Sequence, residues 1–312
     1  MGRDFSLMPR RVPAQVRVVE VGPRDGLQHE PGKVPVETKV ALIEELVAAG
    51  LSIIEVGAFV RPDLVPQMAD TGEVLKRLRP RAGATYMVLV PNRRGLERAQ
   101  ESGAQAIAVF TAASEAFTQA NIGMTVGESL RRFRDLVGEA RQSGLFVRGY
   151  LSTCWWCPYD GPVDPDSVSR VARELVELGC HQLSLADTVG AATPGAVRKL
   201  LERLLAGIPA GQLGVHFHDT RGTALSNALA SLELGITTID ASAGGLGQCP
   251  FAPGALGNLA TEDLLYMLHG MGVETGVDLE LVRSATQRLQ LALGRALPSR
   301  YLQAGPPTAQ RR

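Results

Sequence analysis

Short apolar runs rich in β-branched residues alternate with amphipathic stretches along most of the chain. The apolar runs predict buried strands over residues 16–22, 51–56, 84–90, 104–110, 145–152, 181–186, 213–217 and 236–241. Apolar residues at helical spacing predict helices over 36–49, 68–78, 92–102, 126–142, 166–178, 194–205, 224–234 and 261–271. Because strands that alternate with helices form a parallel sheet, the eight strand–helix units indicate an α/β fold.

The number of units decides between the two common parallel architectures. Eight units within roughly 250 residues have the size of a (β/α)₈ TIM barrel. The alternative, a doubly wound open sheet, usually carries a G-x-G-x-x-G fingerprint after its first strand, whereas this chain has Gly22-Pro-Arg-Asp-Gly26. We therefore expect one TIM-barrel domain over 1–312, with extra C-terminal helices from about 277 to 300 and flexible ends at 1–14 and 301–312.

Composition narrows the class of protein. The chain has 312 residues, of which 45% are hydrophobic, so it can bury a large core. Lys plus Arg and Asp plus Glu are equal at 32 each, so we expect neither a nucleic-acid nor a membrane partner. Four unevenly spaced cysteines suit a reduced cytoplasm better than a disulfide framework, and we expect a cytoplasmic protein.

His216 and His218 lie two residues apart at the end of the predicted strand 213–217. Residues at this spacing on a strand share a face and are about 7 Å apart. Two adjacent imidazoles are poor core residues because their ring nitrogens need polar partners, and a divalent metal is a common partner. Ordinary polar residues remain an alternative on this spacing alone.

Other polar residues follow the predicted strands, where a TIM barrel carries its active site. Arg24 and Asp25 follow the first strand, Glu55 lies in the second, and Asp187 ends the sixth. Simpler roles are available: Asp commonly caps turns and helices, and Glu55 could be a buried carboxylate paired with Arg24. Glu262 lies in the first turn of a predicted helix, where the helix dipole alone explains an acidic residue.

Two further segments carry candidate chemistry. The glycine-rich segment 244–258, which contains Cys249 and ends at Asn258, is either a lid or a long connection. The Cys154-Trp-Trp-Cys157 motif has no second cysteine pair, so we expect packing and pocket lining rather than zinc or redox chemistry.

Together these motifs resemble the hydroxymethylglutaryl-CoA lyase family, and the similarity extends in order over nearly the whole chain. The matching blocks are Val21-Gly-Pro-Arg-Asp-Gly-Leu-Gln28, Ile54-Glu55, Phe59-Val60, Val65-Pro-Gln-Met68, Ala112-Ala-Ser-Glu115, Cys157-Pro-Tyr159, Ala186-Asp-Thr-Val-Gly190, His216-Phe-His-Asp-Thr220 and Gly257-Asn-Leu-Ala-Thr-Glu-Asp263. The last block is far more specific than a His-x-His pair.

The resemblance implies a metal-dependent lyase that cleaves a 3-hydroxy-3-methylglutaryl-CoA-type thioester to acetyl-CoA and acetoacetate, as in leucine degradation. The implied cofactor is Mg²⁺ or Mn²⁺, the implied partner is an acyl-CoA, and the implied assembly is a homo-oligomer such as a dimer. In the residues of this chain, the implied metal ligands are Asp25, His216, His218 and Asn258. The implied catalytic residues are Arg24, Asp25, Cys249, Glu55, Asp187 and Glu262.

The implied reaction agrees with the chemistry of these side chains. Cleavage requires the tertiary hydroxyl to lose a proton and the leaving carbon to form an enolate. Arg24 would stabilise the enolate oxygen as an oxyanion hole does, and Cys249 would protonate the carbanion. The chain departs from the family at Trp156 and Leu256, where smaller residues are usual, so the acyl chain of the substrate stays open.

Alternative functions remain on sequence grounds. A related lyase for a longer 3-hydroxy-3-alkylglutaryl-CoA, or a Claisen-type synthase acting on an acyl-CoA and a 2-oxo acid, would use the same barrel. Two histidines and an acid also describe the facial triad of non-haem iron oxygenases, although strand–helix alternation disfavours that class. A barrel that binds an acyl-CoA without turnover is the non-enzymatic alternative.

Overall fold

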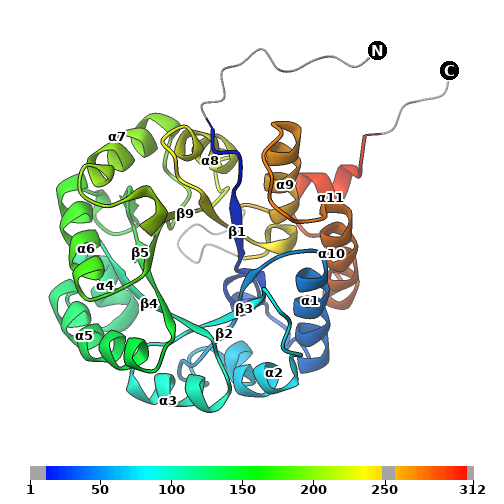
Figure 1. The fold of residues 1–312 in the computed structure, drawn as a ribbon, viewed down its shortest axis with the longest axis horizontal. Coiled ribbons are helices and arrows are strands. Elements are labelled where there is room, and N and C mark those ends of the chain that lie inside the picture. The colour runs from blue at the N-terminus through cyan, green and yellow to red at the C-terminus, as the bar shows by residue number, and fades with distance from the viewer. Residues whose placement is uncertain (1–11, 248–256, 308–312) are drawn as a thin grey trace.

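Eight parallel strands form a closed barrel surrounded by helices (Figure 1). The computed structural model describes residues 12–247 and 257–307. The barrel strands are β1 (Arg17–Glu20), β2 (Ile53–Ala58), β3 (Thr85–Leu89), β4 (Ala106–Ala112), β5 (Phe146–Ser152), β8 (Gln182–Asp187), β9 (Leu213–Phe217) and β10 (Thr238–Ala241). Each pairs with its neighbour in sequence order, and β10 closes the barrel on β1. The predicted TIM barrel and all eight predicted strands are confirmed.

Each predicted helix is present, with bounds that differ by a few residues. These helices are α1 (Val36–Ala48), α2 (Thr71–Arg77), α3 (Arg93–Glu101), α5 (Val126–Gln142), α6 (Pro165–Glu177), α7 (Pro194–Leu205), α8 (Ala224–Leu232) and α9 (Thr261–Gly270). The structure adds α4 (Glu115–Ile122) between β4 and α5, and a small hairpin of β6 (Trp156–Cys157) and β7 (Gly161–Pro162) after β5. None of the described helices has both the length and the apolar composition of a membrane span.

The C-terminal extension contains α10 (Leu279–Leu293), as expected, and α11 (Arg300–Ala304), most of which lies in residues that were expected to be flexible. Asp278 caps α10 by accepting hydrogen bonds from the backbone N–H groups of the first turn. In α11, Leu302 is buried, and near the other end of the chain the Ala14 carbonyl accepts a hydrogen bond from the Glu274 N–H. Flexible ends remain a prediction for residues 1–11 and 308–312, which lie outside the described residues; a single domain over 1–312 likewise remains a prediction.

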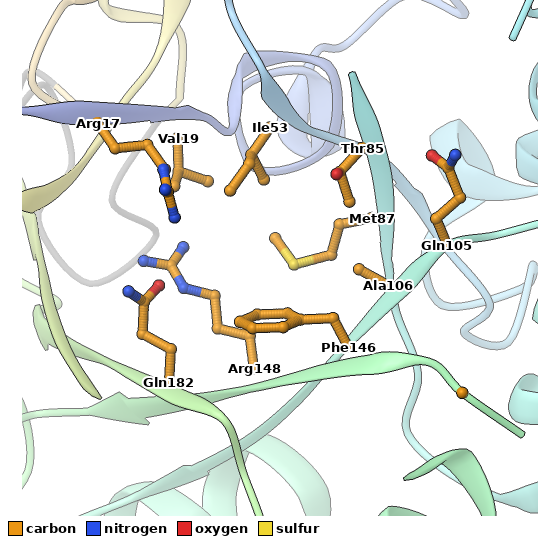
Figure 2. Close-up of a pocket in the computed structure, with 11 residues that line it drawn as sticks. Arg17, Val19, Ile53, Thr85, Met87, Gln105, Ala106, Phe146, Arg148 and Gln182 are labelled. Atoms are coloured by element: carbon orange, nitrogen blue, oxygen red, sulfur yellow. The ribbon is translucent and has the colours of Figure 1, made fainter. Parts of the chain in front are cut away.

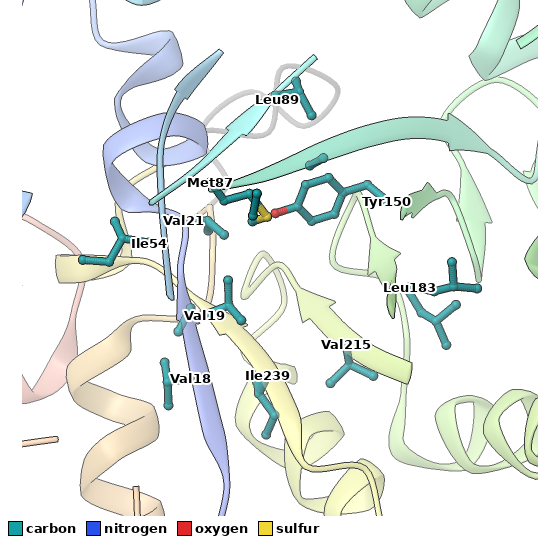
Figure 3. Close-up of a cluster of buried hydrophobic side chains, with 14 of the residues drawn as sticks. Val18, Val19, Val21, Ile54, Met87, Leu89, Tyr150, Leu183, Val215 and Ile239 are labelled. Carbon is teal, nitrogen blue, oxygen red and sulfur yellow. The ribbon is translucent and has the colours of Figure 1, made fainter. Parts of the chain in front are cut away.

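The strand side chains divide between two environments. Outward-facing residues such as Val18, Ile54 and Leu183 are buried in the hydrophobic core around the strands (Figure 3). Inside a TIM barrel, branched apolar residues usually fill the space. Here the buried interior also contains polar residues from several strands: Glu55, Arg148, Tyr150, Ser184, His216 and Asp240. Buried polar groups need partners, so this interior indicates a functional site above it.

Candidate active site and metal centre

A tight turn after β1 places Arg24 and Asp25 at the C-terminal end of the barrel. Residues Gly22–Gly26 form one π-helical turn, in which the N–H groups of Arg24, Asp25 and Gly26 all approach the Val21 carbonyl at 2.8 to 3.3 Å. Gly22 is required because its N–H donates to Glu20 Oε1 at 2.7 Å, and a Cβ there would lie 2.6 Å from that oxygen. The Gly-Pro-Arg-Asp-Gly turn of the sequence is therefore a device that orients two charged side chains.

Asp25, His216 and His218 converge on one point. Each offers a ligand atom, and these atoms lie within 4.8 Å of one another. His216 Nε2 is 3.9 Å from Asp25 Oδ2, and the two imidazole centroids are 5.3 Å apart. Both histidines are buried, and His218 directly follows β9. The barrel thus brings together the predicted histidine pair and the carboxylate of Asp25 from the turn after β1.

Asn258, the fourth predicted ligand, lies beside the same cluster. A β-bridge pairs Asn258 with His218, and the Asn258 side-chain amide donates to Asp25 Oδ2 at 2.8 Å and to the Leu246 carbonyl at 3.0 Å. The other amide atom, Oδ1, is buried without a hydrogen-bond partner among the described residues. The four predicted metal ligands therefore occupy one small volume.

The donor set fits a hard divalent cation. Carboxylate and amide oxygens with imidazole nitrogens are ligands that Mg²⁺ and Mn²⁺ accept. Asn258 Oδ1 and His218 Nδ1 are buried and have no partner among the described residues, which is expensive unless a ligand satisfies them. Burial and the neighbouring His216 lower the pKa of His218 to about 4, so its ring is neutral near pH 7, as metal binding requires.

The charge on Asp25 is also suited to a cation. Burial alone would raise the pKa of Asp25, but Arg24 and the two histidines lower it well below its usual value. The carboxylate is therefore ionised across the physiological pH range. An ionised, partly buried carboxylate beside the neutral imidazole of His218 gives this end of the barrel the electrostatic character of a metal centre.

Arg24 is held by two carboxylates and an aromatic ring. Its Nε and Nη2 atoms donate to Glu55 Oε2 at 2.7 Å, and Nη1 donates to Asp25 Oδ1 at 2.7 Å. The Tyr150 hydroxyl donates to the same Glu55 oxygen at 3.2 Å, and the Arg24 guanidinium lies 5.4 Å from the Tyr150 ring centroid. Burial raises the pKa of Glu55, although Arg24 opposes this change. Glu55 is thus placed to orient Arg24.

Asp240, which the sequence analysis did not single out, contacts the second side of His216. Its Oδ2 lies 3.4 Å from His216 Nδ1, and it accepts hydrogen bonds from Arg148 at 2.7 Å and Ser184 at 2.8 Å. Burial lowers the pKa of His216, but Asp240 and Asp25 outweigh this effect and raise it. The available sequence signal was the inward alternation of Arg148, Ser184 and Asp240 within otherwise apolar strands.

Asp187 lies at the end of β8 and forms hydrogen bonds with the loop that follows this strand. Its two carboxylate oxygens accept hydrogen bonds from the N–H groups of Ala191 and Ala192 at 2.9 and 2.8 Å. Burial raises the pKa of Asp187. These contacts agree with the turn-capping role considered for Asp187. The charge of His216 lowers the pKa of Asp187, but this effect is weaker than that of the backbone N–H groups.

Glu262 forms a hydrogen bond with the start of the glycine-rich segment 244–258. Its carboxylate accepts a hydrogen bond from the Gly244 N–H, with oxygen distances of 3.1 and 2.9 Å. Burial raises the pKa of Glu262 to about 7, and a neighbouring buried carboxyl, Glu20, behaves in the same way. Glu20 accepts hydrogen bonds from the Ala243 N–H and the Thr261 hydroxyl. These two acids therefore contact the start of the glycine-rich segment rather than the cluster of Asp25, His216 and His218.

Cys249 lies in residues 248–256, outside the described residues. The two glycines that flank this segment, Gly247 and Gly257, lie next to Asn258. A Cβ on Gly257 would lie 2.2 Å from the Gly247 carbonyl oxygen, and one on Gly247 would lie 2.6 Å from Asn258 Nδ2. The described residues on either side of this segment, Gly247 and Gly257, therefore lie against each other beside Asn258.

The Cys154–Cys157 motif shows packing contacts. Cys154 Sγ donates to the Leu151 carbonyl, and Cys157 accepts a hydrogen bond from the Ser114 hydroxyl. Both thiols are buried, and burial raises the pKa of Cys154 far above its usual value. Thr153, immediately before them, has φ 54°, which is rare for a β-branched residue and marks strain at the C-terminal end of β5.

Comparisons with known proteins point to one family. The HMGL-like family model matches residues 15–289. The 3-hydroxy-3-isohexenylglutaryl-CoA/hydroxymethylglutaryl-CoA lyase of Pseudomonas aeruginosa is 50% identical and covers 94% of this chain and 98% of its own length. The cytoplasmic 3-hydroxy-3-methylglutaryl-CoA lyase of Danio rerio is 47% identical, and the match covers 97% of this chain and 93% of the relative. The mitochondrial hydroxymethylglutaryl-CoA lyase of Bos taurus is 48% identical, and the match covers 94% of this chain and 90% of the relative.

Solved structures give the same result. Hydroxymethylglutaryl-CoA lyase from Pseudomonas aeruginosa matches with a TM-score of 0.93 and 50% identity, covering 94% of this chain and 98% of its own. An HMG-CoA lyase from Acinetobacter baumannii, solved with coenzyme A and 3-methylmalate, matches with a TM-score of 0.92 and 37% identity, covering 98% of this chain and 99% of its own.

Proposed function

Because the chain belongs to the HMGL-like family, we propose that it is a lyase that cleaves 3-hydroxy-3-methylglutaryl-CoA to acetyl-CoA and acetoacetate. The observation that carries the proposal is the convergence of Asp25, His216 and His218 beside Arg24 at the C-terminal end of the barrel. That end is where TIM-barrel enzymes carry out their chemistry. The resemblance seen in the sequence and the geometry of the site thus support one reaction class.

Asp25, His216, His218 and Asn258 would hold the metal, which we propose to be Mg²⁺ or Mn²⁺. When bound, such a cation lowers the pKa of a coordinated hydroxyl and fixes its position. The chain supplies the geometry: Asp240 orients His216, and Asn258 donates to Asp25. The depressed pKa of Asp25 suits a ligand better than a proton acceptor.

Arg24 would stabilise the negative charge that develops in the reaction. As the C2–C3 bond breaks, the hydroxyl proton would pass to a general base at the metal end of the site, either Asp25 or a base linked to the metal. The C3 oxygen becomes the ketone of acetoacetate, and the bonding electrons move to the acetyl-CoA enolate. A guanidinium has five N–H donors, and Glu55 and Asp25 hold that of Arg24 in a fixed orientation. A preorganised donor of this kind needs no rearrangement as the charge forms.

Cys249 would then protonate the enolate carbon and release acetyl-CoA. Cys249 belongs to the segment between Gly247 and Gly257 in the sequence, and these two described glycines lie against each other. Gly247 packs against Asn258. We propose that Glu262, Glu20 and Asp187 act indirectly, by holding the loops that carry Cys249 and the site.

A longer substrate is the second candidate. The relative at 50% identity is named for 3-hydroxy-3-isohexenylglutaryl-CoA as well as the methyl compound. We therefore propose cleavage of a longer 3-hydroxy-3-alkylglutaryl-CoA as the second candidate activity of this chain. A dimeric assembly, a cytoplasmic location and a role in leucine degradation remain proposals of the sequence analysis.

One assay tests the proposed reaction. Purified protein with Mg²⁺ is incubated with 3-hydroxy-3-methylglutaryl-CoA and, separately, with its isohexenyl analogue, and the products are identified by mass spectrometry. We expect acetyl-CoA from either substrate that is cleaved, together with acetoacetate from the methyl compound, and loss of cleavage in chelator. Absence of acetyl-CoA from both substrates would refute the lyase assignment.

A further inference from the structure

A cavity lies at the end of the barrel away from the cluster of Asp25, His216 and His218. Its volume is about 300 Å³. Six strands contribute their first residues to its wall: Arg17, Ile53, Thr85, Ala106, Phe146 and Gln182. Asp25 and His218, in contrast, follow the C-terminal ends of their strands. Catalysis in TIM barrels uses the C-terminal end, so the proposed reaction does not account for this N-terminal pocket.

Two arginines face each other across the N-terminal pocket. Figure 2 shows the guanidinium groups of Arg17 and Arg148 pointing toward one another from opposite walls. Arg17 forms no ion pair with any carboxylate in the described part of the chain. The acidic residue Glu274 lines an adjoining cavity with Arg17, where it accepts a hydrogen bond from Gln15. Two facing cations repel each other, and an anion between them would remove this repulsion.

Arg148 has donors to spare. Its side chain is only 1% exposed, and Nη2 donates to Asp240 at 2.7 Å. The remaining donor atoms, Nε and Nη1, are buried and have no hydrogen-bond partner among the described residues. A buried charged group with unmade hydrogen bonds is unfavourable. A ligand oxygen could accept from Nε and Nη1 without breaking the pair with Asp240.

The apolar residues of the lining indicate the chemistry of the remainder of the ligand. Val19, Ile53, Met87 and Phe146 supply the apolar part of the lining, in which Val19 lies beside Arg17 and Phe146 beside Arg148 (Figure 2). Arg17 is exposed, and Phe146 is 38% exposed, so the pocket is accessible from solvent. The volume of about 300 Å³ is at the lower end for small-molecule sites and is sufficient for a ligand of a few carbon atoms.

We propose that the N-terminal pocket binds a short-chain aliphatic carboxylate. The carboxylate accepts hydrogen bonds from both guanidinium groups, a geometry in which planar guanidinium and carboxylate groups match well. The branched or straight carbon chain packs against Met87, Ile53 and Phe146. Inorganic phosphate would satisfy the arginines but leave the apolar wall uncovered, so the pocket favours the carboxylate.

Isothermal titration calorimetry with isovalerate tests this proposal. The probes are isovalerate, the uncharged isovaleramide and inorganic phosphate, each titrated into the full chain at millimolar concentration. We expect one isovalerate per chain, with weaker binding of both other probes. Arg17→Gln should weaken isovalerate binding by about tenfold or more, since it removes one exposed cation and leaves the core intact. The control Arg134→Gln, an exposed position on α5, should bind as the wild type does.

The site variant Asp25→Asn separates this pocket from the metal centre. Isovalerate binding should survive in Asp25→Asn, even if that variant has lost all lyase activity. Binding that is lost in Asp25→Asn and kept in Arg17→Gln would place the carboxylate at the C-terminal site and overturn the proposal. An absence of isovalerate binding by the folded wild type, or equal binding of isovaleramide, would also overturn it.

Discussion

Asp240 Oδ2 lies 3.4 Å from Nδ1 of His216, its partner across the β10–β9 ladder. The other ring nitrogen of His216, Nε2, faces Asp25. A carboxylate behind a metal-binding imidazole fixes the ring orientation and its tautomer, and raises its basicity. Arg148 and Ser184 donate hydrogen bonds to Asp240 in turn, so a polar layer inside the barrel supports the proposed metal centre.

Replacement of Asp240 by Asn should weaken metal binding rather than abolish the fold. Loss of such a supporting carboxylate typically lowers metal affinity or activity by about 10- to 100-fold. Mn²⁺ titration followed by electron paramagnetic resonance would measure the affinity, and circular dichroism would confirm the fold. The control Asp135→Asn, on the exposed face of α5, should leave affinity unchanged. Equal affinity in Asp240→Asn and the wild type would show that Asp240 does not support His216.

Replacement of Arg24 by Lys should lower turnover while keeping the positive charge. A lysine cannot bond Glu55 and Asp25 together as the guanidinium does, so the charge loses its fixed orientation. Removal of an oxyanion donor typically lowers kcat by about 10²- to 10³-fold. Steady-state kinetics would show a fall in kcat that exceeds any rise in KM. A variant with kcat within a few-fold of the wild type would remove Arg24 from the proposed role.

Replacement of Cys249 by Ser should slow the protonation step. A hydroxyl is a far weaker acid than a thiol, and general-acid catalysis contributes about 10²- to 10⁴-fold. We expect kcat to fall within that range while Mn²⁺ affinity stays the same. Cys180→Ala, at a buried thiol just before β8, is the matched control and should keep its kcat. Similar kcat values for Cys249→Ser and the wild type would contradict the proposed acid.

Glu262 should make the stability of the protein depend on pH. Burial raises its pKa from 4.5 in the unfolded chain to about 7, so between these values the folded state holds a proton that the unfolded state releases. The free energy of unfolding therefore falls as pH rises through this window. Glu262→Gln cannot ionise yet still accepts from the Gly244 N–H, so this fall should shrink by up to about 3 kcal/mol.

Urea unfolding at about pH 5 and pH 8 would measure this difference. Part of the fall should persist in Glu262→Gln, because burial also raises the pKa of Glu20 to about 7. The control Glu101→Gln, at an exposed position of α3, should follow the wild-type curve. If Glu262→Gln and the wild type lose equal stability between the two pH values, Glu262 is ionised throughout.

The fold was predictable because period-2 and period-3.6 patterns are local properties of a sequence. The run 213–217 is apolar apart from His216, and the structure places β9 over the same residues. The helix α4 and the β6–β7 hairpin were not predicted, because α4 has a weak apolar face and β6 and β7 are only two residues each. Tertiary context decides the conformation of such short segments.

The metal cluster was predictable only in part from local spacing. His216 and His218 share a face by strand alternation, but Asp25 and Asn258 join them through barrel closure, which the family resemblance supplied. Asp240 and Arg148 were missed because a single charged residue in an apolar strand does not reveal its partner. The partner of Asp240 lies 92 residues away in sequence, on a strand across the barrel.

The central claim is that Asp25, His216, His218 and Asn258 share a single cation. Mn²⁺ binding to the full chain, measured by electron paramagnetic resonance on the wild type and on His218→Ala, tests it most directly. The account predicts one tightly bound Mn²⁺ per chain in the wild type and a large loss of affinity in His218→Ala, with the fold retained by circular dichroism. Undiminished binding of one Mn²⁺ by folded His218→Ala would contradict it.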